Sequence, residues 1–581
     1  MIRKLAASVR EYKRPSILSF LFIVGEVIIE CLIPFITADL VNRLKGDLEM
    51  KSLLLTGALL VFMAVVSLAC GGLAGYASAK ASAGFAKNLR HDVFDKVQSF
   101  SFENIDRFSS SSLVTRLTTD IANVQMSYMM IIRGAIRSPL MFIFSVIMAY
   151  IMGGALATAF IVVIPVLIVG LLIIAKKAMP AFHSVFKKYD ILNRSVEENV
   201  RGMRVVKGFA REEYEKKKFG DAAEDIRQDF TRAERIVAFN HPLMQICLYF
   251  NMLFVLTIGA KIIITSRGST IDVGQMSAML TYGFQILMSL MMLSMIYVII
   301  TISLESMRRI TEVLSEESTM KNPESPVTEI KDGSIDFRNV SFKYSRKSEN
   351  YALSDVDLHI DSGMTVGILG GTGSSKSTLV QLIPRLYDAT EGSVMVGGLD
   401  VREYDMTSLR DSVAMVLQKN QLFSGTIKEN LRWGNENAND EELVEACRLA
   451  QADDFIRSFP DGYDTYIEQG GTNVSGGQKQ RLCIARALLK KPKILILDDS
   501  TSAVDTKTDA LIRAGFLRYI PETTKLIIAQ RVASVQDADM IIIMDNGRII
   551  ASGTHDELMN SAPIYREIYE EQTSGRAENE Q

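Results

Sequence analysis

The sequence is poor in cysteine, histidine and tryptophan, and neither charge sign predominates. Its 581 residues include five cysteines, five histidines and one tryptophan. The cysteines lie far apart without a CxxC pair, so the sequence indicates neither a zinc site nor a disulfide framework. The 64 Lys and Arg residues nearly balance 67 Asp and Glu residues, which leaves no general basic field of the kind that nucleic-acid binding uses. We therefore expect no nucleic-acid partner.

Hydrophobic residues are abundant: they make up 48% of the chain, and the mean hydropathy is +0.16 although 23% of residues are charged. This combination indicates that the apolar residues are concentrated in one region. Several uncharged stretches there reach the roughly 20 residues that a membrane-spanning helix needs. One of them, 138–175, is too long for a single span and contains Gly153 and Gly154, which predict a helical hairpin. The sequence thus predicts six spans, near residues 16–38, 53–77, 138–152, 156–175, 241–262 and 273–300.

The distribution of Lys and Arg predicts the orientation of these spans. The N-terminal segment and the connections 80–137 and 176–235 are rich in basic residues, whereas the other connections carry few. The positive-inside rule then places both long connections and both termini in the cytosol. The long connections have helical periodicity. We therefore expect a multi-pass membrane protein with helices that extend well beyond the lipid bilayer.

Two acids interrupt the first predicted span. Glu26 and Glu30 are four residues apart and share a helix face. An acid at this depth needs a partner or water, so the pair either contacts a cationic substrate or packs against polar groups of the helix bundle. The sixth span is rich in methionine, which suits a promiscuous binding cavity but is also ordinary packing material. Residues considered as substrate contacts are Glu26, Glu30, Met288, Met292 and Met295.

The chain changes character after residue 314. A membrane domain is expected over 1–314, a polar linker over 315–333, a soluble domain over 334–572 and a polar tail over 573–581. In the soluble domain a strand-like run, TVGIL, precedes a glycine-rich loop and an apolar helical pattern. Such a loop offers backbone N–H groups to phosphate oxygens. The residues predicted to bind phosphate are Gly370, Gly371, Thr372, Gly373, Ser374, Ser375, Lys376, Ser377 and Thr378.

Two further motifs agree with nucleotide chemistry. The apolar run ILIL is typical of a buried parallel strand and ends in Asp498 and Asp499. Carboxylates at the end of a strand beside a phosphate loop can coordinate Mg²⁺ and activate water. In the phosphate loop, Lys376 would reach the terminal phosphates and Ser377 would ligate the metal. Between the two elements lies a short motif, Val474, Ser475, Gly476, Gly477 and Gln478.

The order of these motifs resembles that of ATP-binding cassette (ABC) exporters, and the connections 89–108, 117–120 and 202–209 resemble the cytoplasmic loops of that family. The resemblance implies an all-α six-helix membrane domain with long cytoplasmic helical loops, followed by an α/β P-loop ABC ATPase domain. It implies ATP and Mg²⁺ as ligands, Tyr344 at the nucleotide, and Ser377, Gln418 and Asp498 at the metal. It also implies a catalytic position for Gln418. It also implies a second half-transporter, because the signature 474–478 of one chain closes on the nucleotide held by the other.

The sequence departs from the family pattern at three positions. Asp499 stands where most ABC exporters have a glutamate that serves as general base, and Gln530 stands where they have the switch histidine. Ser375 replaces the second glycine of the phosphate loop. Aspartate is one methylene shorter than glutamate, and glutamine cannot exchange protons near neutral pH. The signature, in contrast, is intact.

A changed catalytic set combined with an intact signature resembles the subunit that carries the degenerate ATP site in heterodimeric bacterial exporters. The resemblance implies a different partner chain and hydrolysis mainly at the partner's site. It also implies export, across the bacterial cytoplasmic membrane, of amphipathic substrates that are drug-like, lipid or peptide in nature. Two alternatives remain open: a regulatory ATP-binding membrane subunit without transport, and a homodimeric exporter in which Asp499 is the base.

Overall fold

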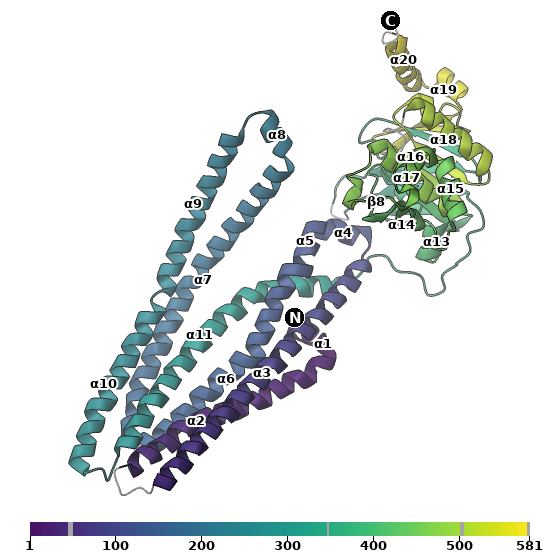
Figure 1. The fold of residues 1–581 in the computed structure, drawn as a ribbon. Coiled ribbons are helices and arrows are strands. Elements are labelled where there is room, and N and C mark those ends of the chain that lie inside the picture. Colours follow the sequence, from purple (N-terminus) through teal and green to yellow (C-terminus); the bar gives the residue numbers. More distant parts are fainter. Residues whose placement is uncertain (45–49, 346–347, 500–504, 578–581) are drawn as a thin grey trace. The chain divides into compact units, whose positions relative to one another are not determined.

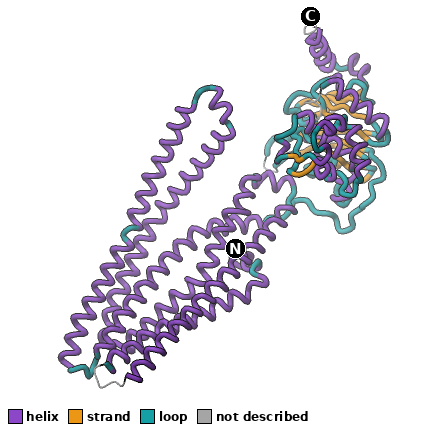
Figure 2. Tube along the Cα trace, viewed as in Figure 1, coloured by secondary structure: helices purple, strands orange, loops and turns teal. Residues whose placement is uncertain are grey.

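The computed structural model describes residues 1–44, 50–345, 348–499 and 505–577. The chain divides into two compact units. The first, called the helical unit below, comprises Met1–Ser99 and Ser109–Glu316; the second, called the α/β unit, comprises Phe100–Phe108 and Glu317–Gln581. Strands occur, within the described residues, only in the second unit (Figure 2). The last residues of the predicted polar tail, 578–581, lie outside the described residues.

The helical unit consists of long helices joined by short turns (Figure 1). Its elements are α1 (Ile2–Ala7), η1 (Arg10–Tyr12), α2 (Lys13–Arg43), α3 (Met50–Gln98), α5 (Ser110–Thr115), η2 (Arg116–Asp120), α6 (Ile121–Gly153), η3 (Gly154–Ala157), α7 (Thr158–Arg201), α8 (Met203–Gly208), α9 (Glu212–Val237), α10 (Asn240–Ser266) and α11 (Val273–Ser315). Helices α7 and α9 pack along each other, and the short α8 joins them at one end.

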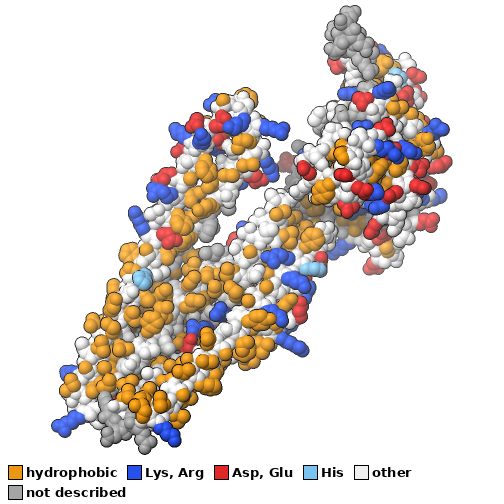
Figure 3. Space-filling model, viewed as in Figure 1, with side chains coloured by type: hydrophobic (Ala, Val, Ile, Leu, Met, Phe, Trp, Pro, Cys, Tyr) orange, Lys and Arg blue, Asp and Glu red, His pale blue; other side chains and the backbone are white. Residues whose placement is uncertain are grey.

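Six helical segments of the described chain are long and apolar enough to cross a membrane, and each overlaps one predicted span. They also extend beyond it, as predicted. Helix α3 has 49 residues, which at 1.5 Å per residue gives about 74 Å, against a hydrocarbon core of about 30 Å. Figure 3 shows hydrophobic side chains along most of the helical unit and a group of charged ones around the end that carries α8. This distribution suits a bilayer around the apolar part.

The predicted hairpin turns at the two glycines. Helix α6 ends at Gly153, and Gly154 adopts a left-handed φ of 49°, with its N–H donating to the carbonyl oxygen of Tyr150. A Cβ atom on Gly153 would lie 2.3 Å from the Sδ atom of Met279. The turn therefore needs one glycine for its backbone angle and the other for close packing against α11.

The interior of the helical unit follows helical periodicity. In α2 the residues Ile23, Val27 and Cys31 are buried at intervals of four and pack against Ala74 of α3 and Met141 of α6. The spacing places them on one face. The opposite face of α2 exposes apolar side chains such as Leu21 and Ile28, as lipid contact requires.

The α/β unit contains two main sheets. The six-stranded sheet has the order β12-β11-β3-β10-β9-β6 and is parallel except for β12. The antiparallel sheet has the order β2-β1-β4-β5, and β7 pairs with β8. The strands are β1 (Ile335–Phe342), β2 (Leu353–Ile360), β3 (Thr365–Leu369), β4 (Glu391–Val396), β5 (Leu399–Asp400), β6 (Val413–Val416), β7 (Gly425–Thr426), β8 (Tyr466–Ile467), β9 (Ile494–Asp498), β10 (Thr524–Ile528), β11 (Met540–Asp545) and β12 (Arg548–Gly553).

The helices of this unit are mostly short. They are α4 (Phe102–Phe108), α12 (Lys376–Gln381), α13 (Met406–Ser412), α14 (Ile427–Arg432), α15 (Asp440–Leu449), α16 (Asp453–Ser458), α17 (Gly476–Leu489), α18 (Thr506–Tyr519), α19 (His555–Ser561) and α20 (Pro563–Ala577), with 3-10 turns η4 (Gly462–Asp464), η5 (Gln469–Gly471) and η6 (Val532–Ser534). Helix α4 comes from the connection between α3 and α5, yet it belongs to this compact unit.

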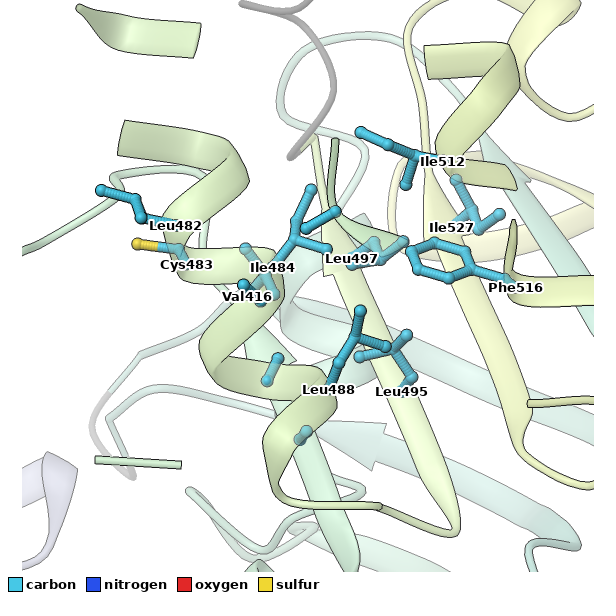
Figure 4. Packing of buried hydrophobic residues seen from close by; sticks show 14 of the residues in the cluster. Val416, Leu482, Cys483, Ile484, Leu488, Leu495, Leu497, Ile512, Phe516 and Ile527 are labelled. Carbon is cyan, nitrogen blue, oxygen red and sulfur yellow. The ribbon is translucent and has the colours of Figure 1, made fainter. Parts of the chain in front are cut away.

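Strand β9 is buried on both faces, which explains its continuous apolar sequence. Leu495 and Leu497 point toward Ile484 and Leu488 of α17 (Figure 4). The alternate residues of β9 belong to a second apolar cluster on the other face of the sheet. The parallel register aligns Ile368 of β3 with Ile528 of β10, and Ile528 with Asp498 of β9. The chain segments that follow β3, β9 and β10 therefore leave the sheet at the same edge.

Candidate nucleotide site and membrane cavity

The glycine-rich loop follows β3 directly and leads into α12. The Nζ atom of Lys376 donates to the carbonyl oxygens of Gly370 and Gly371, both at 2.8 Å. Burial lowers the pKa of the Lys376 ammonium group. The lysine thus folds back over its own loop, where its charge is partly desolvated. An arriving phosphate would exchange these neutral carbonyl contacts for stronger, charge-assisted ones.

The replacement of glycine by Ser375 has a visible consequence. Ser375 precedes α12 with φ 70° and ψ 24°, a left-handed conformation that side chains other than glycine rarely adopt. The loop therefore keeps its shape at the expense of backbone strain. The serine does not remove the loop conformation that phosphate binding requires.

Ser377 and Asp498 meet where a metal ion is expected. The hydroxyl of Ser377 donates to Oδ1 of Asp498 over 2.9 Å. Burial raises the pKa of the Asp498 carboxyl; the Ser377 hydrogen bond opposes this change, and the nearby Asp499 charge adds to it. A hydroxyl and a carboxylate side by side match the oxygen ligands that Mg²⁺ takes beside nucleotide phosphates. The described residues therefore fit a nucleotide with Mg²⁺, which would neutralise the crowded acidic charge.

Asp499 is held by two amide side chains. Its Oδ2 atom accepts hydrogen bonds from Nε2 of Gln530 at 2.7 Å and from Nε2 of Gln418 at 3.3 Å. The parallel sheet explains the meeting, because Asp499 follows β9, Gln530 follows β10 and Gln418 follows β6, which are consecutive neighbours in the sheet. The three predicted catalytic positions are thus brought together, although Gln418 contacts Asp499 where the sequence predicted contact with the metal.

Tyr344 stands at the edge of the same unit. Its ring packs edge-on against Phe342 at 4.9 Å and against Tyr387 at 5.3 Å between ring centroids. Its hydroxyl lies 2.9 Å from Oγ1 of Thr378, the last residue of the predicted phosphate loop. Nearly half of the Tyr344 surface is exposed. The ring is therefore held in place with a free face, as stacking on a nucleobase requires.

The signature motif forms the start of α17. Ser475 is the N-cap: its hydroxyl accepts a hydrogen bond from the Gln478 N–H at 3.3 Å, and Oε1 of Gln478 accepts one from the Ser475 N–H at 2.9 Å. This capping box fixes the first turn, in which Gly476 and Gly477 leave the backbone N–H groups uncovered by side chains. The arrangement offers a helix N-terminus to an anion.

Two connections of this unit were not foreseen from the sequence. In the segment around α4, Asp106 accepts a hydrogen bond from the Tyr387 hydroxyl at 2.7 Å, and Phe102 packs against the Tyr387 ring. In α20, Gln572 donates to the carbonyl oxygen of Gln530 at 2.9 Å and accepts from the Val532 N–H at 2.8 Å. Neither Tyr387 nor Gln572 belongs to a motif, so only their spatial neighbours reveal them.

The helical unit contains a cavity of about 810 Å³. Of the residues considered as substrate contacts, Glu26, Glu30, Met288 and Met292 line it, whereas Met295 is not among the described lining residues. The sequence did not predict the partner of the two acids. Nη2 of Arg137, on α6, donates to Glu30 at 2.7 Å, and its Nε atom lies 3.3 Å from Oε1 of Glu26. Of the two interpretations of these acids, this ion pairing matches packing against polar groups of the bundle.

Comparisons with known proteins agree with this architecture. The family model described as ABC transporter transmembrane region matches residues 16–291, and the one described as ABC transporter matches residues 353–502. Among similar proteins, an uncharacterized ABC transporter ATP-binding protein of Bacillus subtilis, YfiB, is 36% identical over 573 residues, covering 98% of each chain. An uncharacterized ABC transporter ATP-binding protein of Mycobacterium tuberculosis is 32% identical, covering 98% of this chain and 97% of the relative.

A solved structure shares the fold of nearly the whole chain. It is described as a bacterial Atm1-family ABC exporter with ATP bound, and it matches with a TM-score of 0.83 and 23% identity, covering 97% of this chain and 98% of the other. The fold class predicted from the sequence is thereby confirmed. The chain belongs to the ABC transporter family and is a transport ATPase that carries a six-helix membrane domain and an ATP-binding cassette in one polypeptide.

Proposed function

We propose that this chain is one half of a heterodimeric ABC exporter and carries its degenerate ATP site. In this proposal, the chain lies in the bacterial cytoplasmic membrane with its cassette and both termini in the cytosol. It binds ATP-Mg²⁺ through Tyr344, Lys376, Ser377 and Asp498, and it contributes little hydrolysis of its own. A different half-transporter supplies the active catalytic acid.

The observation that carries the proposal is the environment of Asp499. A general base must reach within about 2.6–3.2 Å of the proton that it takes. The Asp499 side chain is one methylene shorter than glutamate, and its Oδ2 atom already accepts hydrogen bonds from Gln530 and Gln418. Both donors are amides that neither gain nor lose protons near neutral pH. This arrangement favours a held carboxylate over a base that activates water.

The intact signature supports the other half of the proposal. Ser475 and Gln478 form a complete capping box, and the glycines between them leave the first N–H groups of α17 accessible. In an ABC dimer this surface would face the nucleotide of the partner. A chain that had lost its whole catalytic role would need neither the capping box nor the glycines. The chain thus combines a changed ATP site of its own with an intact signature that would act at the partner's site. This combination favours a heterodimer.

The proposed cycle uses these parts in sequence. Closure of the two cassettes around nucleotide is favoured because contacts of Ser475 and Gly477 with the partner's nucleotide exist only in the closed state. Hydrolysis at the partner's site then reopens the dimer, while Lys376, Ser377 and Asp498 retain nucleotide. The Tyr387–Asp106 hydrogen bond joins the α4 segment to the cassette, so movement of the cassette would be passed to α3 and α5, the helices on either side of α4.

The proposed cargo is amphipathic: drug-like, lipid or peptide. The cavity of the helical unit supports this class, because it combines about 810 Å³ of space with apolar side chains such as Met288 and Met292 and a few charged ones. Outward transport is inferred from the exporter fold shared with the solved structure. A regulatory subunit without transport would have no use for such a cavity.

The test is Asp499→Asn in the purified two-chain complex, reconstituted in lipid vesicles. We expect ATP turnover and substrate transport to change by less than about twofold, since this carboxylate is not the working base. The same acid-to-amide substitution at the partner's catalytic acid serves as the matched control and is expected to abolish both. Loss of turnover with Asp499→Asn would refute the proposal and favour Asp499 as a base. Normal turnover without transport of any probe would favour the regulatory alternative.

A further inference from the structure

We propose that the membrane cavity selects amphiphiles with an anionic head group, which Arg133 binds. This inference rests on the proposed function only in taking the cavity as the substrate site. The cavity is lined by two acids, Glu26 and Glu30, and by two arginines of α6, Arg133 and Arg137. The formal charges of these four residues therefore cancel, but both acids pair with Arg137.

Arg137 satisfies both acids. Its Nη2 atom lies 2.9 and 2.7 Å from the two carboxylate oxygens of Glu30, and its Nε atom lies 3.3 Å from Glu26. The Glu26 side chain is only 13% exposed and that of Glu30 is 28% exposed. A cationic substrate would have to displace a guanidinium group that already bonds to both acids. The acids are consequently poor attachment points for a cation.

Arg133 is the cation that remains available. It lies one helical turn before Arg137 on α6, so the two share a face. Within the described part of the chain, Arg133 forms no ion pair or hydrogen bond, and its side chain is exposed at the cavity wall. Its guanidinium carbon and two of its nitrogens lie 3.7–3.9 Å from the point where a Cβ atom on Gly75 of α3 would lie. The guanidinium group thus lies against α3 at the turn that carries Gly75.

Gly71 of α3 leaves space for the Glu26 carboxylate. A Cβ atom on Gly71, one turn before Gly75 on α3, would lie 3.1 Å from Oε1 of Glu26. The two glycines therefore form a small-residue face against which Glu26 and Arg133 lie side by side without pairing. Arg133 and Glu26 thus lie at neighbouring turns of α3, and within the described residues Glu26 pairs with Arg137 and not with Arg133.

The chemistry of this arrangement favours an anion. A guanidinium group in an apolar cavity is costly when unpaired, and it forms bidentate hydrogen bonds with carboxylate, phosphate or sulfonate groups. Apolar side chains line the same cavity and offer a surface for an alkyl or aromatic tail: Ile33, Pro34, Met141, Phe284, Met288 and Met292. An anionic head at Arg133 with an apolar tail along α11 satisfies both features of the cavity.

The experiment compares three probes that differ only in their head group. The probe ω-(dansylamino)undecanoic acid is an anion, ω-(dansylamino)undecylamine is a cation and ω-(dansylamino)undecanol is neutral. Binding of each probe to the purified transporter in neutral-lipid nanodiscs is titrated by dansyl fluorescence without nucleotide. We expect the anion to bind at least about tenfold more tightly than the cation, the effect of about one charge-assisted contact. Substitution Arg133→Gln should remove this preference, whereas Arg133→Lys should retain most of it.

Arg308→Gln is the matched control, because Arg308 is an exposed arginine of α11 paired with Glu305 and lies outside the cavity. It should leave all three affinities unchanged. Tighter binding of the cation than of the anion, or an anion preference that persists in Arg133→Gln, would overturn the proposal. These binding measurements need no hydrolysis, so they succeed or fail independently of the degenerate-site proposal. If none of the probes binds, the assignment of this cavity as the substrate site is itself wrong.

Discussion

At the scale of single residues, we propose that Asp499 and Gln530 limit ATP hydrolysis at the nucleotide site. Because Gln530 holds the short carboxylate through a 2.7 Å hydrogen bond, we expect activity to return only when both residues change. In a complex whose partner acid is disabled, Asp499→Glu together with Gln530→His should raise ATP turnover by about tenfold or more, since a positioned base contributes 10² to 10⁴-fold. Each single substitution should recover less. No recovery in the double variant would mean that other features make the site inactive.

Ser375 gives a second prediction at this scale. Its left-handed backbone costs about 1–2 kcal/mol for a residue with a Cβ atom, so Ser375→Gly should stabilise the cassette by about 1 kcal/mol. The chain has one tryptophan, Trp433, which lies in the α/β unit and stacks on Phe423. Its fluorescence during urea unfolding therefore reports on this unit. Ser375→Ala is the control, because it keeps the Cβ atom; a gain of similar size with alanine would contradict the backbone explanation.

At the scale of elements, helix α20 holds the segment that follows β10. Gln572 holds the segment after β10 by two hydrogen bonds, to the Gln530 carbonyl oxygen and the Val532 N–H. Each contributes about 1 kcal/mol, so Gln572→Ala should speed hydrogen exchange of the Val532 amide by about fivefold. Gln572→Glu keeps the acceptor for Val532 and should preserve most of the protection. Glu571→Ala, at the adjacent exposed position, is the control. Unchanged exchange in Gln572→Ala would show that α20 does not hold this segment.

Elements with strong local signals could be predicted from the sequence. The run ILIL has the composition of a buried parallel strand, and β9 is one; Ser475 and Gln478 have the spacing of a capping box, and α17 begins there. The contact between Asp106 and Tyr387 could not be predicted, because it joins residues 281 positions apart through a tertiary arrangement that no local pattern records. Gln572 was overlooked for the same reason.

The charge pattern of the sequence does not reveal the surroundings of Arg137. The connection 80–137, which the positive-inside rule predicts to be cytosolic, ends at this residue. In the structure, α6 begins at Ile121 and carries both Arg133 and Arg137 to the cavity wall. The number of spans follows from hydropathy, length and the Gly153–Gly154 turn, and the structure confirms it with six apolar helical segments in the described residues. The electrostatics of the cavity depend instead on which helix faces meet.

At the scale of the whole molecule, we propose a half-transporter that needs a different partner chain for ATP turnover. The most direct test measures ATP turnover of the purified chain alone in lipid and of the same chain co-purified with its partner half-transporter. We expect near-zero ATP turnover for the chain alone and strong ATP turnover for the pair. The turnover of the pair should disappear when the partner's catalytic acid is replaced. Strong turnover by the isolated chain, lost in Asp499→Asn, would contradict this proposal and identify a homodimeric transporter with Asp499 as its base.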